Sequence, residues 1–545
     1  MFMDNTFKEF PIPTYEEWRQ LVERTLKGKT FDESLLTPLI DEIVLEPMYQ
    51  SKDIENNQTL NDRPGTYPFI RGNTQEPLKW SVSQVIEAAT PKLLHERISH
   101  DFEKGQDHTH FVLTSEMKQG RKPTRNEEET GIPFFNLSTV HEALNGIDLS
   151  NKPLHLDTGV VSLPILGALS LTSKKLKGTI GSDPLHQLVS FGSIDYSLDR
   201  SFDLMALATK WARKQHPQLR TVLVQSHIYH NGGASPSLEL ASALSTAVEY
   251  ISALIERGLS ATEAGQSLLF SFSIGSDYFS EIAKIRAARA LWAAIMKEFG
   301  ASEEGQKMTI HAKTSTFTKT KDDCHVNILR CTTEAFAAAI AGVESLQVSP
   351  FDELLQEPSE HARRIARNTS LILREEAHLA VTSDPAGGSW YVEHLTEQMA
   401  MKAWELFQEL EENGGMSASL KKGIVQTLVQ KCWNKRVEKV RTRKQTIIGV
   451  NQYINTDDKR PTKPASRVEE RNSYFDYIEQ QKEVTKKHEI ETMEDVLKMV
   501  SEQTPFHHIH KQLKEGGKKE CVTPIKQYRL AEPFEQQHPK KDGGS

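Results

Sequence analysis

Short strand-like runs alternate with long helical patterns through the middle of this 545-residue chain. From about residue 77 to 390, each run is followed by a segment with apolar positions at helical spacing, such as residues 238–257 and 281–299. The expected strands are residues 79–85, 111–115, 154–158, 178–182, 222–227, 268–274, 308–314 and 345–349. Strand–helix alternation predicts parallel pairing, and about eight such units predict a closed (β/α)8 TIM barrel of the α/β class. No Gly-x-Gly-x-x-Gly follows an early strand, which counts against a Rossmann fold.

The expected strands carry small polar residues on one face. In residues 269–274, Phe270 and Phe272 share one face while Ser271 and Ser273 share the other. Other strands have similar polar faces: His311, Lys313 and Ser315; Ser345, Gln347 and Ser349; and Thr179 with Gly181. Because outer helices must cover the apolar faces, we expect the polar faces to point inward, where buried hydroxyls need partners. Water or a polar chain along the axis would supply them; alternatively, some of these residues sit at strand ends, satisfied by loops and solvent.

The barrel is expected to span residues 61–390. The segments on either side of it are expected to be mainly helical. Residues 1–60 form an arm with a helix that starts at a capping box, Thr14 with Glu17, and ends near Gly28. Such an arm cannot bury itself, so it should pack on another domain or subunit. Residues 391–455 are expected to be a helical extension packed on the barrel. Residues 456–545 read as a charged linker, a helix over about 492–515 and a polar, disordered tail from 533.

Composition excludes several functional classes. Lys and Arg number 66 against 74 Asp and Glu, so the formal charge of −8 gives no basic field for nucleic acid. No run of about 18 apolar residues predicts a membrane span, and the first residues lack a signal-peptide pattern. Four cysteines without zinc or disulfide spacing indicate a reducing, cytoplasmic location. His507, His508 and His510 are read as solvated rather than as metal ligands, so no metal site is expected.

Several ordered motifs resemble one known family. The run Thr66-Tyr67-Pro68-Phe69-Ile70-Arg71-Gly72 resembles the substrate-threading loop of the methylmalonyl-CoA mutase family, and the segment 226–234, which contains His230, resembles its active-site histidine segment. Further similar blocks are residues 283–292, 364–369, 384–393 and 448–451.

This resemblance implies a fold and a chemistry. Catalytic members of the family are isomerases that interconvert methylmalonyl-CoA and succinyl-CoA by radical chemistry with adenosylcobalamin. Their barrel encloses the substrate, and a separate flavodoxin-like domain holds the cobalamin. By resemblance, His230 falls on the catalytic histidine, while the expected substrate contacts are Tyr67, Arg71, Arg286, Ser273 and Lys313.

The chain departs from the family pattern in four places. No tyrosine stands between Gly72 and Trp80, where catalytic members have an essential one. The arginine that pairs with the substrate carboxylate falls at Phe191, and Lys313 replaces an expected glutamine. No Asp-x-His-x-x-Gly occurs, so no cobalamin-binding flavodoxin-like domain is expected. These departures resemble the small, non-catalytic subunit of heterodimeric bacterial mutases.

Three functions therefore stay open. The first is an accessory subunit of methylmalonyl-CoA mutase, paired with a catalytic large subunit that binds the adenosylcobalamin. The second is the catalytic barrel of a split acyl-CoA mutase whose cobalamin sits on a separate cobalamin-binding protein. Phe191 would then suit an uncharged acyl group such as isobutyryl. The third is a protein that binds an acyl-CoA ester without turning it over.

Overall fold

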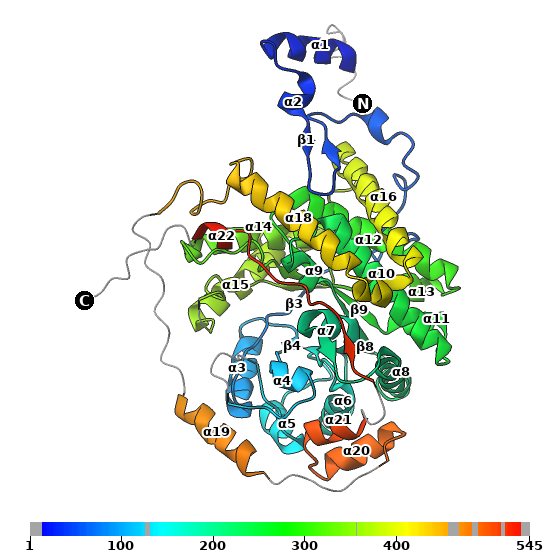
Figure 1. Cartoon of the computed structure of the whole chain (residues 1–545), viewed down its shortest axis with the longest axis vertical. Helices are drawn as coiled ribbons and strands as arrows, with labels where there is room; N and C mark the ends of the chain where they lie inside the picture. The colour runs from blue at the N-terminus through cyan, green and yellow to red at the C-terminus, as the bar shows by residue number, and fades with distance from the viewer. Residues whose placement is uncertain are drawn as a thin grey trace, which may run out of the picture.

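The computed structural model describes residues 13–125, 131–355, 357–455, 468–481, 489–513 and 518–535. At its centre, eight strands pair in parallel in the order β3-β11-β10-β9-β8-β6-β5-β4 (Figure 1). Their bounds are β3 Ser81–Val82, β4 Thr109–His110, β5 Leu154–Asp157, β6 Gly178–Ser182, β8 Leu219–Gln225, β9 Leu268–Ile274, β10 Ile310–Thr314 and β11 Ser345–Gln347.

The two edge strands of this sheet meet and close it. The Ile86 N–H donates to the His110 carbonyl at 2.8 Å, and Ile86 forms a parallel bridge with Phe111. One long helix follows each strand: α3 Pro91–Glu103, α5 Leu137–Leu144, α6 Ser162–Thr172, α8 Leu198–Gln215, α10 Pro236–Glu256, α12 Tyr278–Glu298, α14 Asn327–Ile340 and α15 Glu360–Leu371. The predicted (β/α)8 barrel is confirmed, although β4 begins two residues before the expected strand.

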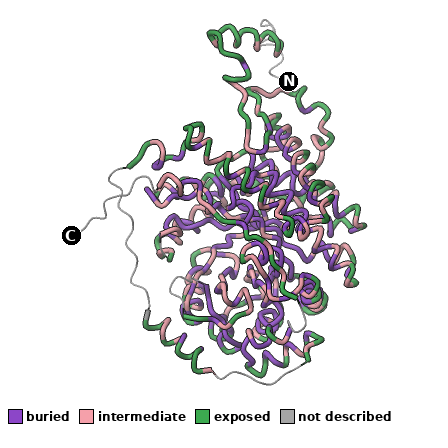
Figure 2. Tube along the Cα trace, viewed as in Figure 1, coloured by how far each residue is buried: buried purple, intermediate pink, exposed green. Residues whose placement is uncertain are grey.

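The core lies between the strands and the outer helices, and it is purple in Figure 2. Phe270 of β9 points outward and packs edge-on against Trp292 of α12, with ring centroids 4.9 Å apart. Ser271 and Ser273 of the same strand point the other way and bond the imidazole of His227. The prediction of a polar inner face is therefore confirmed for this strand.

Helix α10 is long and apolar enough to cross a membrane by length and composition alone. Most of its residues are buried against the barrel and against α16 (Trp390–Glu412), as in a core helix. Helices α17 (Gly415–Lys421) and α18 (Ile424–Arg441) continue the layer that α16 begins.

The N-terminal arm stands away from the body (Figure 1). Its helix α1, Tyr15–Thr25, begins at the predicted capping box and contains no buried residue. Helix α2 (Phe31–Leu35) and the hairpin β1–β2 (Thr37–Pro38 with Val44–Leu45) connect it to the body. The shorter elements of the chain are η1 Ser51–Ile54, α4 Ser115–Lys118, α7 Pro184–Phe191, β7 Ser193–Ile194, α9 His227–Asn231, α11 Ala261–Gln266, α13 Glu303–Gln306, η2 Cys324–Val326, η3 Ile372–Glu376 and η4 Leu379–Val381.

The C-terminal residues differ from expectation. Helix α19, Val468–Gln480, packs Phe475 and Ile478 against Phe135, while residues 456–467 of the expected linker lie outside the described residues. The single helix expected over 492–515 is two, α20 Met493–Ser501 and α21 Phe506–Leu513, because Pro505 cannot continue a helix.

The expectation of solvated histidines in α21 is wrong for two of them. His508 and His510 are buried, since this face of α21 packs on the barrel helices, and only His507 is partly exposed.

We call residues 520–535 the C-terminal strap. Its strand β12, Glu520–Cys521, pairs with β7, and its helix α22, Glu532–Glu535, ends the described chain. The strap crosses the face of the barrel as the red segment in Figure 1. Pro533 therefore lies in a helix rather than in a disordered tail; residues 536–545 of that expected tail lie outside the described residues.

Candidate functional site

The loop of residues 66–72 lies at the amino-terminal end of the barrel. The Asn73 side chain beside it donates to the Met308 carbonyl at 2.6 Å and to Glu344 at 2.7 Å, and these residues directly precede β10 and β11. Tyr67 is half-exposed, and the ammonium of Lys297 lies 4.4 Å from the centre of its ring.

Arg71 and Arg286 share one buried ion cluster. Arg71 bonds Asp384 at 2.7 Å and Glu393 at 3.0 Å. Arg286 bonds Glu393 at 2.8 Å and also contacts Asp384. The cluster ties the loop to α12 and to the first turn of α16, so both guanidinium groups have partners within the chain. Their assignment as substrate contacts stays a prediction.

His230 lies at the opposite, carboxyl-terminal end, on α9 just after β8. Its Nδ1 lies 3.2 Å from Glu239 of α10, and its Nε2 lies 2.7 Å from the Ser315 hydroxyl, just after β10. Since an ionised carboxylate only accepts, Nδ1 carries a proton, and in the neutral ring the Ser315 hydroxyl then donates to Nε2.

A buried lysine fixes the charge of this histidine's partner. The Lys284 ammonium lies 2.7 Å from Glu239 and 2.6 Å from Glu281. Burial alone would raise the pKa of Glu239, but Lys284 and His230 together hold that pKa well below its ordinary value. Burial likewise opposes the charge on Lys284, yet the two carboxylates raise its pKa. Glu239 is therefore ionised at neutral pH.

Ser315, His230 and Glu239 stand in the order of a nucleophile, a base and an orienting carboxylate. Ser315 is fully buried, however, and its backbone N–H donates to Glu334 at 3.1 Å. That N–H is not available to stabilise an oxyanion. The arrangement therefore suits an orienting hydrogen bond better than acyl transfer.

A row of aromatic rings covers His230. The His230 ring packs on Phe317 with centroids 5.9 Å apart, and Phe317 packs on Trp433 of α18 at the same distance. Trp433 stacks on Tyr528 of the C-terminal strap at 4.2 Å. His230 is consequently only 7% exposed.

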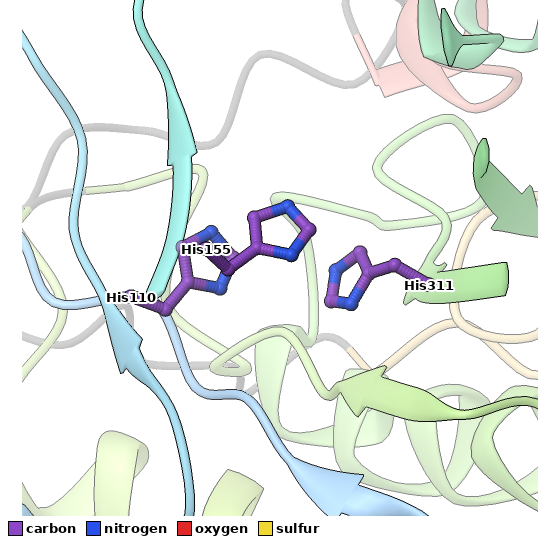
Figure 3. A group of neighbouring side chains, drawn as sticks. All are labelled: His110, His155 and His311. Carbon is purple, nitrogen blue, oxygen red and sulfur yellow. The ribbon is translucent and has the colours of Figure 1, made fainter. Parts of the chain in front are cut away.

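Three buried imidazoles lie close together inside the barrel. His110 of β4, His155 of β5 and His311 of β10 point toward one another (Figure 3). The ring centroids are 4.3 Å apart for His110 and His155, and 4.1 Å apart for His155 and His311. Burial lowers the pKa of His110 to about 3 and those of His155 and His311 well below the ordinary value, so all three rings are neutral.

Ser273 and Lys313, the remaining predicted site residues, face each other in the register of β9 and β10. Ser273 bonds His227 Nδ1 at 2.8 Å, and Lys313 lies two residues after His311 on the inner face of β10. The sequence indicated that His311 points inward but did not indicate His110 or His155. For His155, the alternation Leu154-His155-Leu156 on a buried strand was the available signal.

Phe191, expected where catalytic members have an arginine, ends α7. It is 39% exposed and lines a small cavity with Tyr196 and His510, beside the C-terminal helices.

Comparison with known proteins decides the family. A family model described as methylmalonyl-CoA mutase matches residues 39–521. The chain belongs to the methylmalonyl-CoA mutase family. Among the described residues, the barrel and its helical additions are present, and no flavodoxin-like domain is found.

The chain is similar to both subunit types of this mutase. It is 35% identical over 462 residues to the methylmalonyl-CoA mutase small subunit of Streptomyces virginiae, which covers 82% of this chain and 71% of that protein. A small subunit of Porphyromonas gingivalis is 32% identical, with 83% and 71% covered. The large subunit of Streptomyces virginiae is 28% identical, with 82% and 63% covered.

Proposed function

We propose that this chain is the accessory small subunit of a methylmalonyl-CoA mutase and acts in the cytoplasm. It would support a catalytic large subunit that interconverts methylmalonyl-CoA and succinyl-CoA and holds the adenosylcobalamin. The proposal rests on the family membership and on the higher identity to proteins named as small subunits.

The observation that carries the proposal is the group of imidazoles across the barrel axis. The loop with Arg71 and the histidine His230 lie at opposite ends of the barrel. A thioester reaching from one to the other would have to pass the buried, closely packed side chains of His110, His155 and His311. The aromatic cover over His230 supports the same conclusion.

The arm offers a surface for the partner subunit. Leu21 of α1 is 61% exposed, and Trp390 at the start of α16 is 48% exposed. A cavity of about 470 Å³ lies between the arm and α16, lined among others by Leu35, Tyr49 and Trp390. Exposed apolar side chains such as Leu21, and a hollow with apolar lining residues, are each typical of protein–protein contacts.

Co-expression tests the proposal. We expect this chain and the large subunit to elute as one heterodimer in size-exclusion chromatography with light scattering, and the pair to be more active than the large subunit alone. Leu21→Asp should weaken the heterodimer, whereas Leu329→Asp on α14, a similarly exposed leucine, should not. Two separate peaks at micromolar concentrations would contradict the proposal.

The intact network around His230 favours a second candidate, the catalytic barrel of a split acyl-CoA mutase. Tyr67, Arg71, Arg286, Ser273 and Lys313 would then contact the ester. Turnover of methylmalonyl-CoA or isobutyryl-CoA with a free-standing cobalamin protein, abolished by His230→Gln, would establish it. If neither ester is turned over, the second candidate is excluded. Calorimetry with succinyl-CoA would then test whether the chain binds an acyl-CoA ester without turnover.

A further inference from the structure

Three imidazoles from three strands meet inside the barrel, and what they bind can be tested whichever candidate function is correct. One ring nitrogen from each of His110, His155 and His311 lies within 4.8 Å of the other two. We infer that these three histidines bind one first-row transition-metal ion, with Zn²⁺ as the best fit.

The distances suit such an ion after small side-chain rotations. Zinc–nitrogen bonds of 2.0–2.1 Å place two tetrahedral ligand nitrogens about 3.4 Å apart. The nitrogens must therefore approach one another by on the order of 1 Å. The three side chains come from β4, β5 and β10 and point toward one another (Figure 3), so rotation of the side chains is the movement that metal binding requires.

Neighbouring groups orient two of the rings. His110 Nδ1 lies 3.0 Å from the Ser83 carbonyl, which can only accept, so this nitrogen carries the proton and Nε2 keeps its lone pair. His311 Nδ1 lies 2.8 Å from the Ser345 hydroxyl, and a proton on this nitrogen leaves Nε2 of His311 free in the same way. Metal-binding histidines ordinarily have such a partner on the second nitrogen.

The donor set selects the class of ion. Three imidazoles without a carboxylate suit zinc, copper, nickel or iron, and do not suit calcium or magnesium. Within the described residues, this is the one group of three or more His, Cys, Asp or Glu residues with ligand atoms this close. Three histidines leave one tetrahedral position for water.

Lys313 opposes the site. Lys313 follows His311 by two residues on β10, so the two side chains lie on the same face of the strand and the ammonium stands near the ring. A cation on the axis must overcome that repulsion, so removing the lysine charge should tighten binding. The inference therefore predicts a variant that binds the metal ion more tightly than the wild type does.

The test uses Co²⁺ with the full chain, first stripped of metal by a chelator. We expect about one Co²⁺ per chain, the visible absorption bands of a tetrahedral site, and displacement by Zn²⁺. Ser345→Ala, which removes only the partner of His311, should weaken binding about 10- to 100-fold. Lys313→Gln should strengthen it, and His155→Gln should abolish the bands.

The matched control is the double variant His507→Gln, His508→Gln, which removes histidines of α21 outside the barrel. It should bind Co²⁺ as the wild type does. Absence of tetrahedral bands in the wild-type chain, whatever the variants do, would overturn the inference. Equal uptake by the wild type and a folded His155→Gln chain, checked by circular dichroism, would also overturn it.

Discussion

Lys284 is a fully buried lysine whose charge depends on two carboxylates. Replacing it with methionine leaves Glu239 and Glu281 buried without their cation. We expect Lys284→Met to lower the free energy of unfolding by about 3–5 kcal/mol, the usual cost of breaking a buried pair from one side. Guanidinium unfolding measures this. Lys402→Met, which breaks an ion pair to the exposed Glu405, should cost at most about 1 kcal/mol. Equal effects would contradict the assignment.

Asp183 makes stability depend on pH. Burial raises its pKa to about 7, although the Tyr250 hydroxyl and the Gln225 N–H donate to its carboxylate. The unfolded chain releases this proton near pH 4, so the native state holds more protons between about pH 4 and 7. The stabilising contribution is complete below about pH 4 and is lost as the pH rises through about 7.

This sign predicts a difference between the wild type and Asp183→Asn, which cannot titrate. The free energy of unfolding of the wild type minus that of the variant should fall by up to about 4 kcal/mol between pH 4 and 8. Unfolding curves at unit pH steps measure it. Tyr250→Phe should extend the fall to higher pH, because it removes a bond that favours the ionised form. A difference that stays constant with pH would exclude this role for Asp183.

For single residues, the sequence allowed the residues of the family motifs to be predicted, but not the residues that they contact. His230 could be found because a family segment surrounds it. The partner of Arg71 could not be found, since Asp384 lies 313 positions away and any of the acidic residues could have filled that place. The inward direction of Ser273 followed from strand alternation, but His110 belongs to a two-residue strand that is too short to show a period.

At the scale of elements, Gly178 of β6 lies close to the backbone of the neighbouring strand β5. Its φ is +92°, and a Cβ at this position would lie 2.1 Å from the Leu154 carbonyl oxygen of β5. We expect Gly178→Ala to cost about 3 kcal/mol or more, since it adds a backbone clash to the strain of positive φ. Gly146→Ala, also at positive φ but in open space, should cost about 1 kcal/mol. Thermal unfolding measures the loss of stability in each variant. Equal losses would show that the close approach of β5 and β6 does not restrict the residue at position 178.

Strand and helix identity could be predicted because burial on both sides gives each element a strong pattern. Element ends could not be predicted as well. Strand β8 starts at Leu219, three residues before the expected run, because the polar residues Arg220 and Thr221 separate Leu219 from the apolar run that begins at Val222. The helices α20 and α21 are separate because Pro505 interrupts them. This proline is visible in the sequence, but the prediction of a single helix did not take it into account.

For the whole molecule, the C-terminal strap closes the barrel end that holds His230. Tyr528→Ala removes the ring stacked on Trp433, and we expect a loss of about 1 kcal/mol together with faster modification of His230 by diethyl pyrocarbonate. Peptide mass spectrometry measures the modification rate. Tyr453→Ala, at a tyrosine that is 79% exposed, should change neither quantity. An unchanged rate in Tyr528→Ala would show that the strap does not control access.

The order of synthesis gives this strap a further consequence. Translation must add 173 residues between Gln347, the end of β11, and Glu520, the start of β12 (520 − 347). At the usual elongation rate this takes roughly 10–30 s. During that interval the nascent barrel can already pair its strands while its carboxyl mouth is uncovered. A helper protein that contacts the carboxyl-terminal end of the barrel can therefore do so on the ribosome before the strap covers it.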